Sequence, residues 1–366
     1  MIPFIDLRSQ YHSLKQEIDG AIARVLEHGQ YIMGPEVAEM EQALAAYTGS
    51  EHCIAVASGT EALLISLMAL GIGPGDEVIM PAFTFAATAE VVVLASATPV
   101  LIDIEPHTCN VDAALIEAAI TKRTRAIMPV SLYGQTADMQ EINALAERHG
   151  LAVIEDGAQS FGAEYLGRKS CAVSTLGCTS FFPSKPLGCY GDGGAIFTDD
   201  SALALACSEI RVHGQSGRYH HTRIGVGGRM DTLQCAVVLT KLKRFEWEIA
   251  RRVEIGERYN RLLSERGIER VSQKQDRTSV FAQYTIFVDD RETVQRTLEA
   301  AGIPTAVHYP APLSEQPAYR DRCVFGPLPH SEQASRRVLS LPMHAYLEQS
   351  DQDRIVDAVA KAVAGK

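Results

Sequence analysis

The chain has 366 residues and a net charge of −11, with 46% hydrophobic and 22% charged residues. This composition is typical of soluble globular proteins and excludes general disorder, collagen-like repeats and a long coiled coil. The acidic balance disfavours nonspecific binding to nucleic acid or to an anionic membrane, because their phosphate groups would repel the protein. The sequence predicts neither a membrane-spanning apolar run nor a signal peptide, so we expect a soluble, cytoplasmic protein.

The first half of the chain alternates between two hydrophobic patterns. Before residue 50, apolar residues at helical spacing predict two helices. Strands are then predicted at residues 53–57, 77–80, 98–102, 126–130 and 152–155, and helices at 61–70, 84–95 and 137–149. Strands that alternate with helices indicate βαβ units, so we expect an α/β fold whose mostly parallel sheet is flanked by helices.

The pattern changes after residue 185. A strand at 195–198 is followed by a long helix at 233–263, a strand at 284–288 and helices at 294–300 and 351–364. We place the domain boundary inside the long helix. This divides the chain into a large domain at 1–240 and a smaller C-terminal α+β domain at 241–366.

Eight cysteines are scattered along the chain without a CxxC pair. Zinc sites are typically built from closely spaced ligand pairs, so the sequence predicts no metal site. In a chain with no predicted export signal, we expect the cysteines to be reduced thiols, several of them buried.

Ser58-Gly59-Thr60 stands where a predicted strand ends and a helix begins. Free backbone N–H groups and the positive end of the helix dipole meet at such a point and can bind a phosphate. Simple helix capping is the alternative interpretation, because Ser and Thr are common N-caps. Neither GxGxxG nor GxxxxGK[ST] occurs, which argues against a dinucleotide or triphosphate site.

Two further residues are candidates for ligand binding or catalysis. Asp156 directly follows a predicted strand, at the sheet edge where α/β proteins bind ligands, although it could also be a turn residue. Lys185 stands between Pro183 and Pro186 among apolar residues, where desolvation would lower its pKa as a Schiff-base lysine requires. A buried ion pair is the alternative role for this lysine.

A phosphate site, a carboxylate and a desolvated lysine together suit pyridoxal 5′-phosphate (PLP). In this arrangement Asp156 would keep the pyridine nitrogen protonated, Lys185 would bond to the cofactor, and Phe85 would stack on its ring.

The sequence resembles the DegT/DnrJ/EryC1/StrS sugar aminotransferases, within the fold-type I PLP enzymes. The resemblance covers nearly the whole chain and is carried by FIDL at 4–7, GQYIMGPEV at 29–37, ASGTEAL at 57–63, PAFTFAAT at 81–88, IEDGAQS at 154–160, SFFPSKPLG at 180–188 and HYP at 308–310. It implies that Lys185 is the catalytic lysine. The implied cofactor-binding residues are Gly59, Thr60, Phe85, Asp156, Gln159, Ser180, Lys185 and Arg229.

The resemblance also implies a homodimer with shared active sites, because a segment matching residues 225–230 usually reaches the partner's site. Many members have Asn where Gly227 stands, and this Asn contributes to the phosphate site across the dimer. Gly227 has no side chain for that contact, so Arg229 or backbone groups would take it over. A dehydratase branch of the family has His in place of the lysine, and Lys185 therefore indicates a transaminase.

The implied reaction takes the amino group of L-glutamate to a ketone on a nucleotide-linked sugar. The sequence looks closest to members that aminate C3 of UDP-N-acetyl-3-keto-glucuronic acid, for bacterial surface polysaccharide such as lipopolysaccharide O-antigen. A cationic patch for an anionic sugar would comprise His213, Arg229 and His308, with Tyr309 beside it. The alternative interpretation is that His213 is a simple loop residue and His308 serves the fold. The alternatives are a 4-keto-6-deoxyhexose aminotransferase, a Rossmann-type oxidoreductase and a non-catalytic binding protein.

Overall fold

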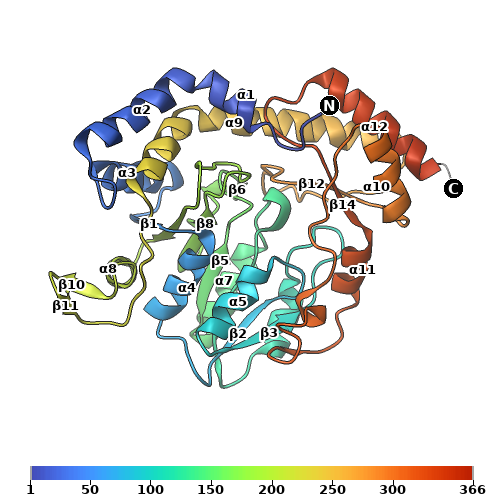
Figure 1. Cartoon of the computed structure of the whole chain (residues 1–366). Helices are drawn as coiled ribbons and strands as arrows, with labels where there is room; N and C mark the ends of the chain where they lie inside the picture. Colours follow the sequence, from blue (N-terminus) through green and yellow to red (C-terminus); the bar gives the residue numbers. More distant parts are fainter. Residues whose placement is uncertain (1, 365–366) are drawn as a thin grey trace.

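A central sheet, helices on both of its faces and one long helix organise the chain (Figure 1). The structure is a computed structural model that describes residues 2–364. The α-helices are α1 Leu7–Ser13, α2 Lys15–His28, α3 Pro35–Thr48, α4 Gly59–Ala69, α5 Ala86–Leu94, α6 Ile116–Ala119, α7 Met139–His149, α8 Ser201–Ile210, α9 Thr232–Ser264, α10 Arg291–Ala300, α11 Pro329–Arg337 and α12 Gln349–Ala364. The strands are β1 His52–Val56, β2 Glu77–Pro81, β3 Thr98–Ile102, β4 Thr124–Ile127, β5 Ala152–Asp156, β6 Glu164–Tyr165, β7 Arg168–Lys169, β8 Leu176–Ser180, β9 Gly194–Thr198, β10 Gln215–Gly217, β11 His220–His221, β12 Tyr284–Phe287, β13 Val324–Phe325 and β14 Val338–Leu341.

The largest sheet within residues 2–364 has eight strands in the order β1-β9-β8-β5-β4-β2-β3-β13. The pairs from β8 to β13 are parallel, whereas β9 runs antiparallel to both β8 and β1. The α/β fold with a mostly parallel sheet is therefore confirmed. In such a sheet the carboxyl ends of the parallel strands meet at one edge, and that edge carries the site described below.

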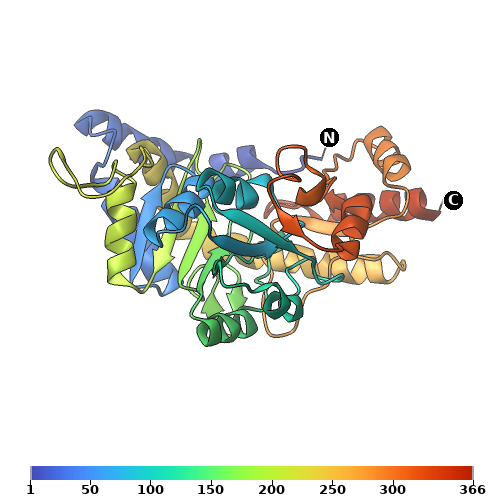
Figure 2. The same cartoon turned by 90° about the horizontal axis from the view of Figure 1, so that it is seen from below.

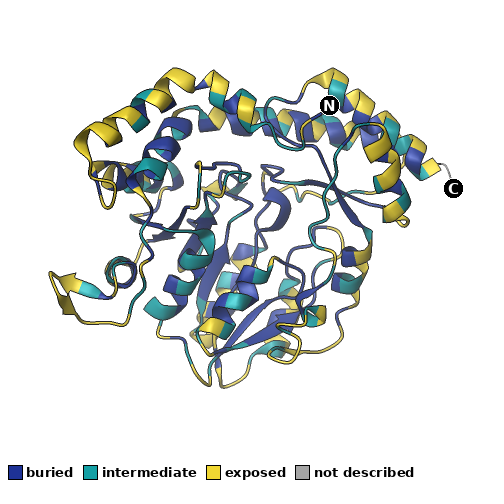
Figure 3. Cartoon of the chain, viewed as in Figure 1, coloured by how far each residue is buried: buried dark blue, intermediate teal, exposed yellow. Residues whose placement is uncertain are grey.

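Helices cover both faces of the sheet, so its central strands are buried (Figure 3). Helices α4 and α5 pack against one face, with Val56, Leu67 and Val78 in their shared core. Helix α7 covers the other face through Ile142, which packs near Ile127. Burial on both faces explains why the parallel strands are short apolar runs without alternation.

Helix α9 connects the large sheet to a smaller C-terminal unit. Up to Ile249 its buried side chains pack with the large domain, and from Ile255 onward they pack with the C-terminal core. That core also holds α10, α12 and the antiparallel pair β12–β14. The packing thus changes well after residue 240, and the predicted boundary there stays a prediction.

Strands β10 and β11 form a hairpin that projects from the body, as both views show (Figures 1 and 2). We call residues 213–224 the arm. Tyr219 and Ile224 in it are 81% and 85% exposed. Among residues 2–364 no helix is long and apolar enough to cross a membrane.

Candidate active site

A cleft of about 320 Å³ opens at the carboxyl ends of β2, β5 and β8. Its walls come from seven segments of the sequence, between residues 58 and 309. The lining includes Ser58, Gly59, Thr60, Thr84, Phe85, Val130, Asp156, Ala158, Gln159, Ser180, Phe182, Lys185, Asp192, Gln283, His308 and Tyr309. The cleft therefore brings together every predicted site residue except His213 and Arg229.

The start of α4 forms an anion cup at one end of the cleft. Ser58 Oγ accepts a hydrogen bond from Glu61 N at 3.0 Å, so Ser58 does cap the helix, while Gly59 and Thr60 line the cleft. Gly59 lies so close to Ser180 that a Cβ at residue 59 would stand 2.7 Å from the Ser180 Cβ. This close approach puts the Ser180 hydroxyl beside the free N–H groups of the helix, a donor set that fits a phosphate.

Asp156 ends β5 and is buried. Thr88 Oγ1 donates to its Oδ2 at 3.1 Å, and Ala158 N donates to its Oδ1 at 3.2 Å. Burial raises the pKa of this carboxyl, while Lys185 and Thr88 act in the opposite direction. A cationic partner in the cleft, such as a protonated pyridine nitrogen, would favour the carboxylate form.

Lys185 lies in a tight turn that follows β8. Its backbone N–H donates to Phe182 O at 2.9 Å, and prolines flank it on both sides. Burial lowers the pKa of the Lys185 amine, and the nearby Asp156 opposes that shift. Among the described residues the Lys185 Nζ has no hydrogen-bond partner, which leaves it available to a ligand.

Aromatic rings and an amide form a connected network in the lining of the cleft. Gln159 Nε2 donates to Tyr309 Oη at 3.0 Å, and Tyr133 N donates to Gln159 Oε1 at 2.9 Å. The Phe85 ring is 55% exposed and lies 5.9 Å from the Tyr309 ring. Such an exposed apolar ring in a cleft suits a stacking partner.

His308 lines the cleft as predicted, but it does not add positive charge. Burial, with Lys185, lowers the pKa of His308 to about 4, so the ring is neutral near pH 7. Its Nδ1 lies 3.0 Å from Ser340 Oγ, and its carbonyl accepts a hydrogen bond from Tyr133 Oη. His308 can therefore orient a polar ligand but cannot neutralise an anionic one.

His213, Gly227 and Arg229 lie together at the base of the arm. A Cβ at Gly227 would stand 3.2 Å from His213 Cε1 and 3.7 Å from Arg229 Nη2. A side chain here would therefore require the exposed His213 ring to shift by a few tenths of an ångström. Neither His213 nor Arg229 lines the cleft of its own chain, and their predicted roles stay predictions.

Sequence reasoning did not find Thr88 and Tyr133, although both bond to predicted site residues. Thr88 belongs to the quoted PAFTFAAT motif, so the motif contained the signal. Tyr133 carried no local signal, because its partner His308 is distant in the sequence.

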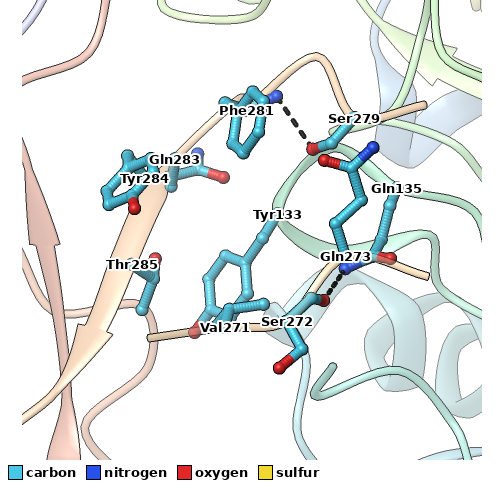
Figure 4. Close-up of a pocket in the computed structure, with 10 residues that line it drawn as sticks. All are labelled: Tyr133, Gln135, Val271, Ser272, Gln273, Ser279, Phe281, Gln283, Tyr284 and Thr285. Carbon is cyan, nitrogen blue, oxygen red and sulfur yellow. Dashed lines mark hydrogen bonds between the residues drawn. The ribbon is translucent and has the colours of Figure 1, made fainter. Parts of the chain in front are cut away.

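A second, much smaller cavity of about 20 Å³ shares Gln283 with the cleft (Figure 4). Gln283 lines both spaces, and its Oε1 is buried without a hydrogen-bond partner. Polar side chains surround the cavity, among them Gln135 and Ser279. The volume suits about one water molecule and is too small for a substrate.

Comparison with known proteins shows the family of the chain. The sequence profile of the DegT/DnrJ/EryC1/StrS aminotransferase family matches residues 12–360. The chain belongs to this family. It is 57% identical to the UDP-2-acetamido-2-deoxy-3-oxo-D-glucuronate aminotransferase of Pseudomonas aeruginosa over 348 residues, which cover 95% of this chain and 96% of that protein. The predicted family and enzyme class are thus confirmed.

Solved structures agree with this membership. A DegT DnrJ EryC1 StrS aminotransferase from Brucella abortus superposes with a TM-score of 0.97 at 44% identity and covers both chains completely. NtdA from Bacillus subtilis, solved with bound cofactor PMP, superposes with a TM-score of 0.92 at 32% identity, covering 99% of this chain and 85% of that one. These neighbours confirm the predicted fold of an aminotransferase.

Proposed function

We propose that the chain is a PLP-dependent aminotransferase that moves the amino group of L-glutamate to C3 of a UDP-linked 3-keto-N-acetylglucosaminuronic acid. The main support for the enzyme class is that Lys185, Asp156 and the anion cup line the same cleft. The identity to the Pseudomonas aeruginosa enzyme supports the choice of sugar. The product would serve the synthesis of a diacetamido-uronic acid of a bacterial surface polysaccharide, in the cytoplasm.

The residues present fit PLP at three points. Gly59, Thr60 and Ser180 would hold the phosphate, Asp156 would face the ring nitrogen, and Phe85 would cover one ring face. When bound, PLP supplies an electron sink for the electron pair left behind when a proton leaves the amino-bearing carbon. Thr88 and Ala158 keep the Asp156 carboxylate fixed, which matters because a fixed charge needs no reorganisation during the reaction.

Lys185 is the proton carrier in this proposal. Its lowered pKa leaves more of the amine in the free-base form near neutral pH, and a free base can accept the proton from the amino donor. The same amine, once protonated, can return that proton to the acceptor carbon. The turn between two prolines fixes the backbone of Lys185, from which Nζ reaches into the cleft.

Arg229, with His213, would complete the site from the partner subunit of a homodimer. Their position at the base of the arm, away from the cleft of their own chain, supports a role across the two subunits. The Arg229 guanidinium would meet an anionic part of the nucleotide sugar.

Nitrogen-15-labelled L-glutamate tests this function directly. The protein is incubated with PLP, labelled glutamate and the UDP-linked 3-keto-uronic acid, and the sugar is analysed by mass spectrometry and NMR. We expect the label at C3 of the sugar. Label transfer only to a dTDP-linked 4-keto-6-deoxyhexose would replace the sugar, and no transfer to any keto sugar would contradict the enzyme class.

A further inference from the structure

The turn that carries Lys185 is closed on itself by backbone contacts. Cys189 N donates to Phe181 O at 2.7 Å, and Lys185 N donates to Phe182 O. Gly188 packs so tightly that a Cβ there would stand 2.6 Å from Pro183 O and 2.8 Å from Phe182 O. Residues 181–189 therefore move as one piece, and whatever fixes Gly188 also fixes Lys185.

Lys241 of α9 contacts this turn. Its Nζ donates to Gly188 O at 2.6 Å and lies 4.2 Å from the centre of the Tyr190 ring. From the same helix, Gln234 Oε1 accepts a hydrogen bond from Tyr190 N at 2.8 Å. Helix α9 thus holds the end of the turn at two points.

A lysine at this position is costly for the fold alone. Its side chain is 2% exposed, and among residues 2–364 no carboxylate lies within ion-pair distance of its amine. The buried Glu248 lies two helical turns away and is already bonded by Gln10 at 2.9 and 3.0 Å. A methionine would fill a similar volume without the desolvation penalty of a buried charge.

We propose that Lys241 is a positioning residue of the transamination reaction, whose ammonium group holds Gly188 and thereby the place of Lys185 Nζ in the cleft. This inference rests on the proposed function, because the exact position of Lys185 matters only if Lys185 takes part in transamination. The geometry is favourable because a charged donor makes a stronger and shorter hydrogen bond than a neutral one. Burial lowers the pKa of Lys241 to about 8, while Glu248 and Cys189 act in the opposite direction. The amine is therefore still mostly protonated near pH 7.

Hydrogen exchange on the protein without cofactor tests the proposal independently of catalysis. In Lys241→Met, amides of residues 181–192 should exchange at least about tenfold faster, while β2 keeps its wild-type rates. The matched control is Lys243→Met, which removes an exposed lysine from the same helix and should leave all rates unchanged. Unchanged exchange at 181–192, or an equal rise throughout residues 2–364, would overturn the proposal.

Kinetics of the PLP-loaded enzyme give the second readout. Lys241→Met should lower kcat about 10- to 100-fold with little change in KM for L-glutamate, because a small displacement of the catalytic group affects mainly the chemical step. Lys241→Arg keeps a cation and its N–H donors, so it should restore most of the activity and the slow exchange at 181–192. If the Met variant does not fold, fast exchange in a folded Arg variant would overturn the proposal. Absence of amino transfer in the wild type would instead contradict the proposed function and leave the exchange result intact.

Discussion

The cleft and the base of the arm differ in how far a single chain completes them. In the cleft, Asp156 and Gln159 are buried and each has hydrogen bonds that fix its side chain. At the base of the arm, His213 is exposed and Arg229 is half-buried, and neither faces the cleft of its own chain. The contrast shows that the cleft residues are fixed within one chain, whereas His213 and Arg229 would act on a site only in the proposed homodimer.

The largest effect is expected from Lys185→Ala, which removes the proposed proton carrier. Amino transfer should fall by at least about 10³-fold, because no other amine lines the described part of the cleft. Transfer of labelled nitrogen measures the loss. The anion cup and Asp156 remain, so the variant should still bind PLP in a dialysis assay. Lys122→Ala, which changes an exposed lysine, is the control and should keep full activity.

Asp156→Asn tests the charge on the cleft floor. The amide keeps the size of the side chain but cannot stabilise a protonated ring nitrogen, and we expect kcat to fall about 10²-fold or more. Steady-state kinetics with L-glutamate measure this change. Asp199→Asn alters an exposed acid far from the cleft and should leave kcat unaltered. Equal activity of both variants would remove Asp156 from the proposed mechanism.

Thr88→Val should have a smaller effect that depends on pH. The hydroxyl stabilises the charged form of Asp156, so its loss should raise the pKa of that carboxyl further. Activity should then fall about tenfold, which corresponds to a hydrogen bond to a charged group of about 1.5 kcal/mol. The acidic limb of the rate profile should move to higher pH. A profile that keeps its wild-type acidic limb would show that Thr88 does not act through Asp156.

Arg229→Ala should produce the smallest change and should act on the sugar alone. We expect KM for the nucleotide sugar to rise by less than about tenfold, since a partly exposed charge is screened by water. The glutamate half-reaction should keep its rate. Arg218→Ala at the tip of the arm is the matched control. An unchanged KM for the sugar would argue against a role of the arm base in the site.

Much of the fold could be predicted because its signals are local. The short apolar runs of β1, β2, β3 and β5 and the glycines that end α2 and α3 lie within single segments. Strand β8 was not predicted, since Leu176–Ser180 contains small residues without alternation, and only its pairing between β5 and β9 makes it a central strand.

In the site, too, local motifs were predictive and features that depend on long-range folding were not. Motifs predicted Asp156, Ser180 and Lys185, which the structure brings together in the cleft. The neutral state of His308 and the place of Arg229 depend on burial and on chain folding, and no local pattern encodes them.

The visible absorbance of the purified protein tests the central claim, that this cleft is a PLP aminotransferase site, most directly. With PLP added, the wild type should show the band of lysine-bound cofactor. L-Glutamate should remove that band, and the UDP-linked 3-keto-uronic acid should restore it. Lys185→Ala should lack the band from the start. A wild type without the band, or one whose band does not respond to L-glutamate, would contradict the account.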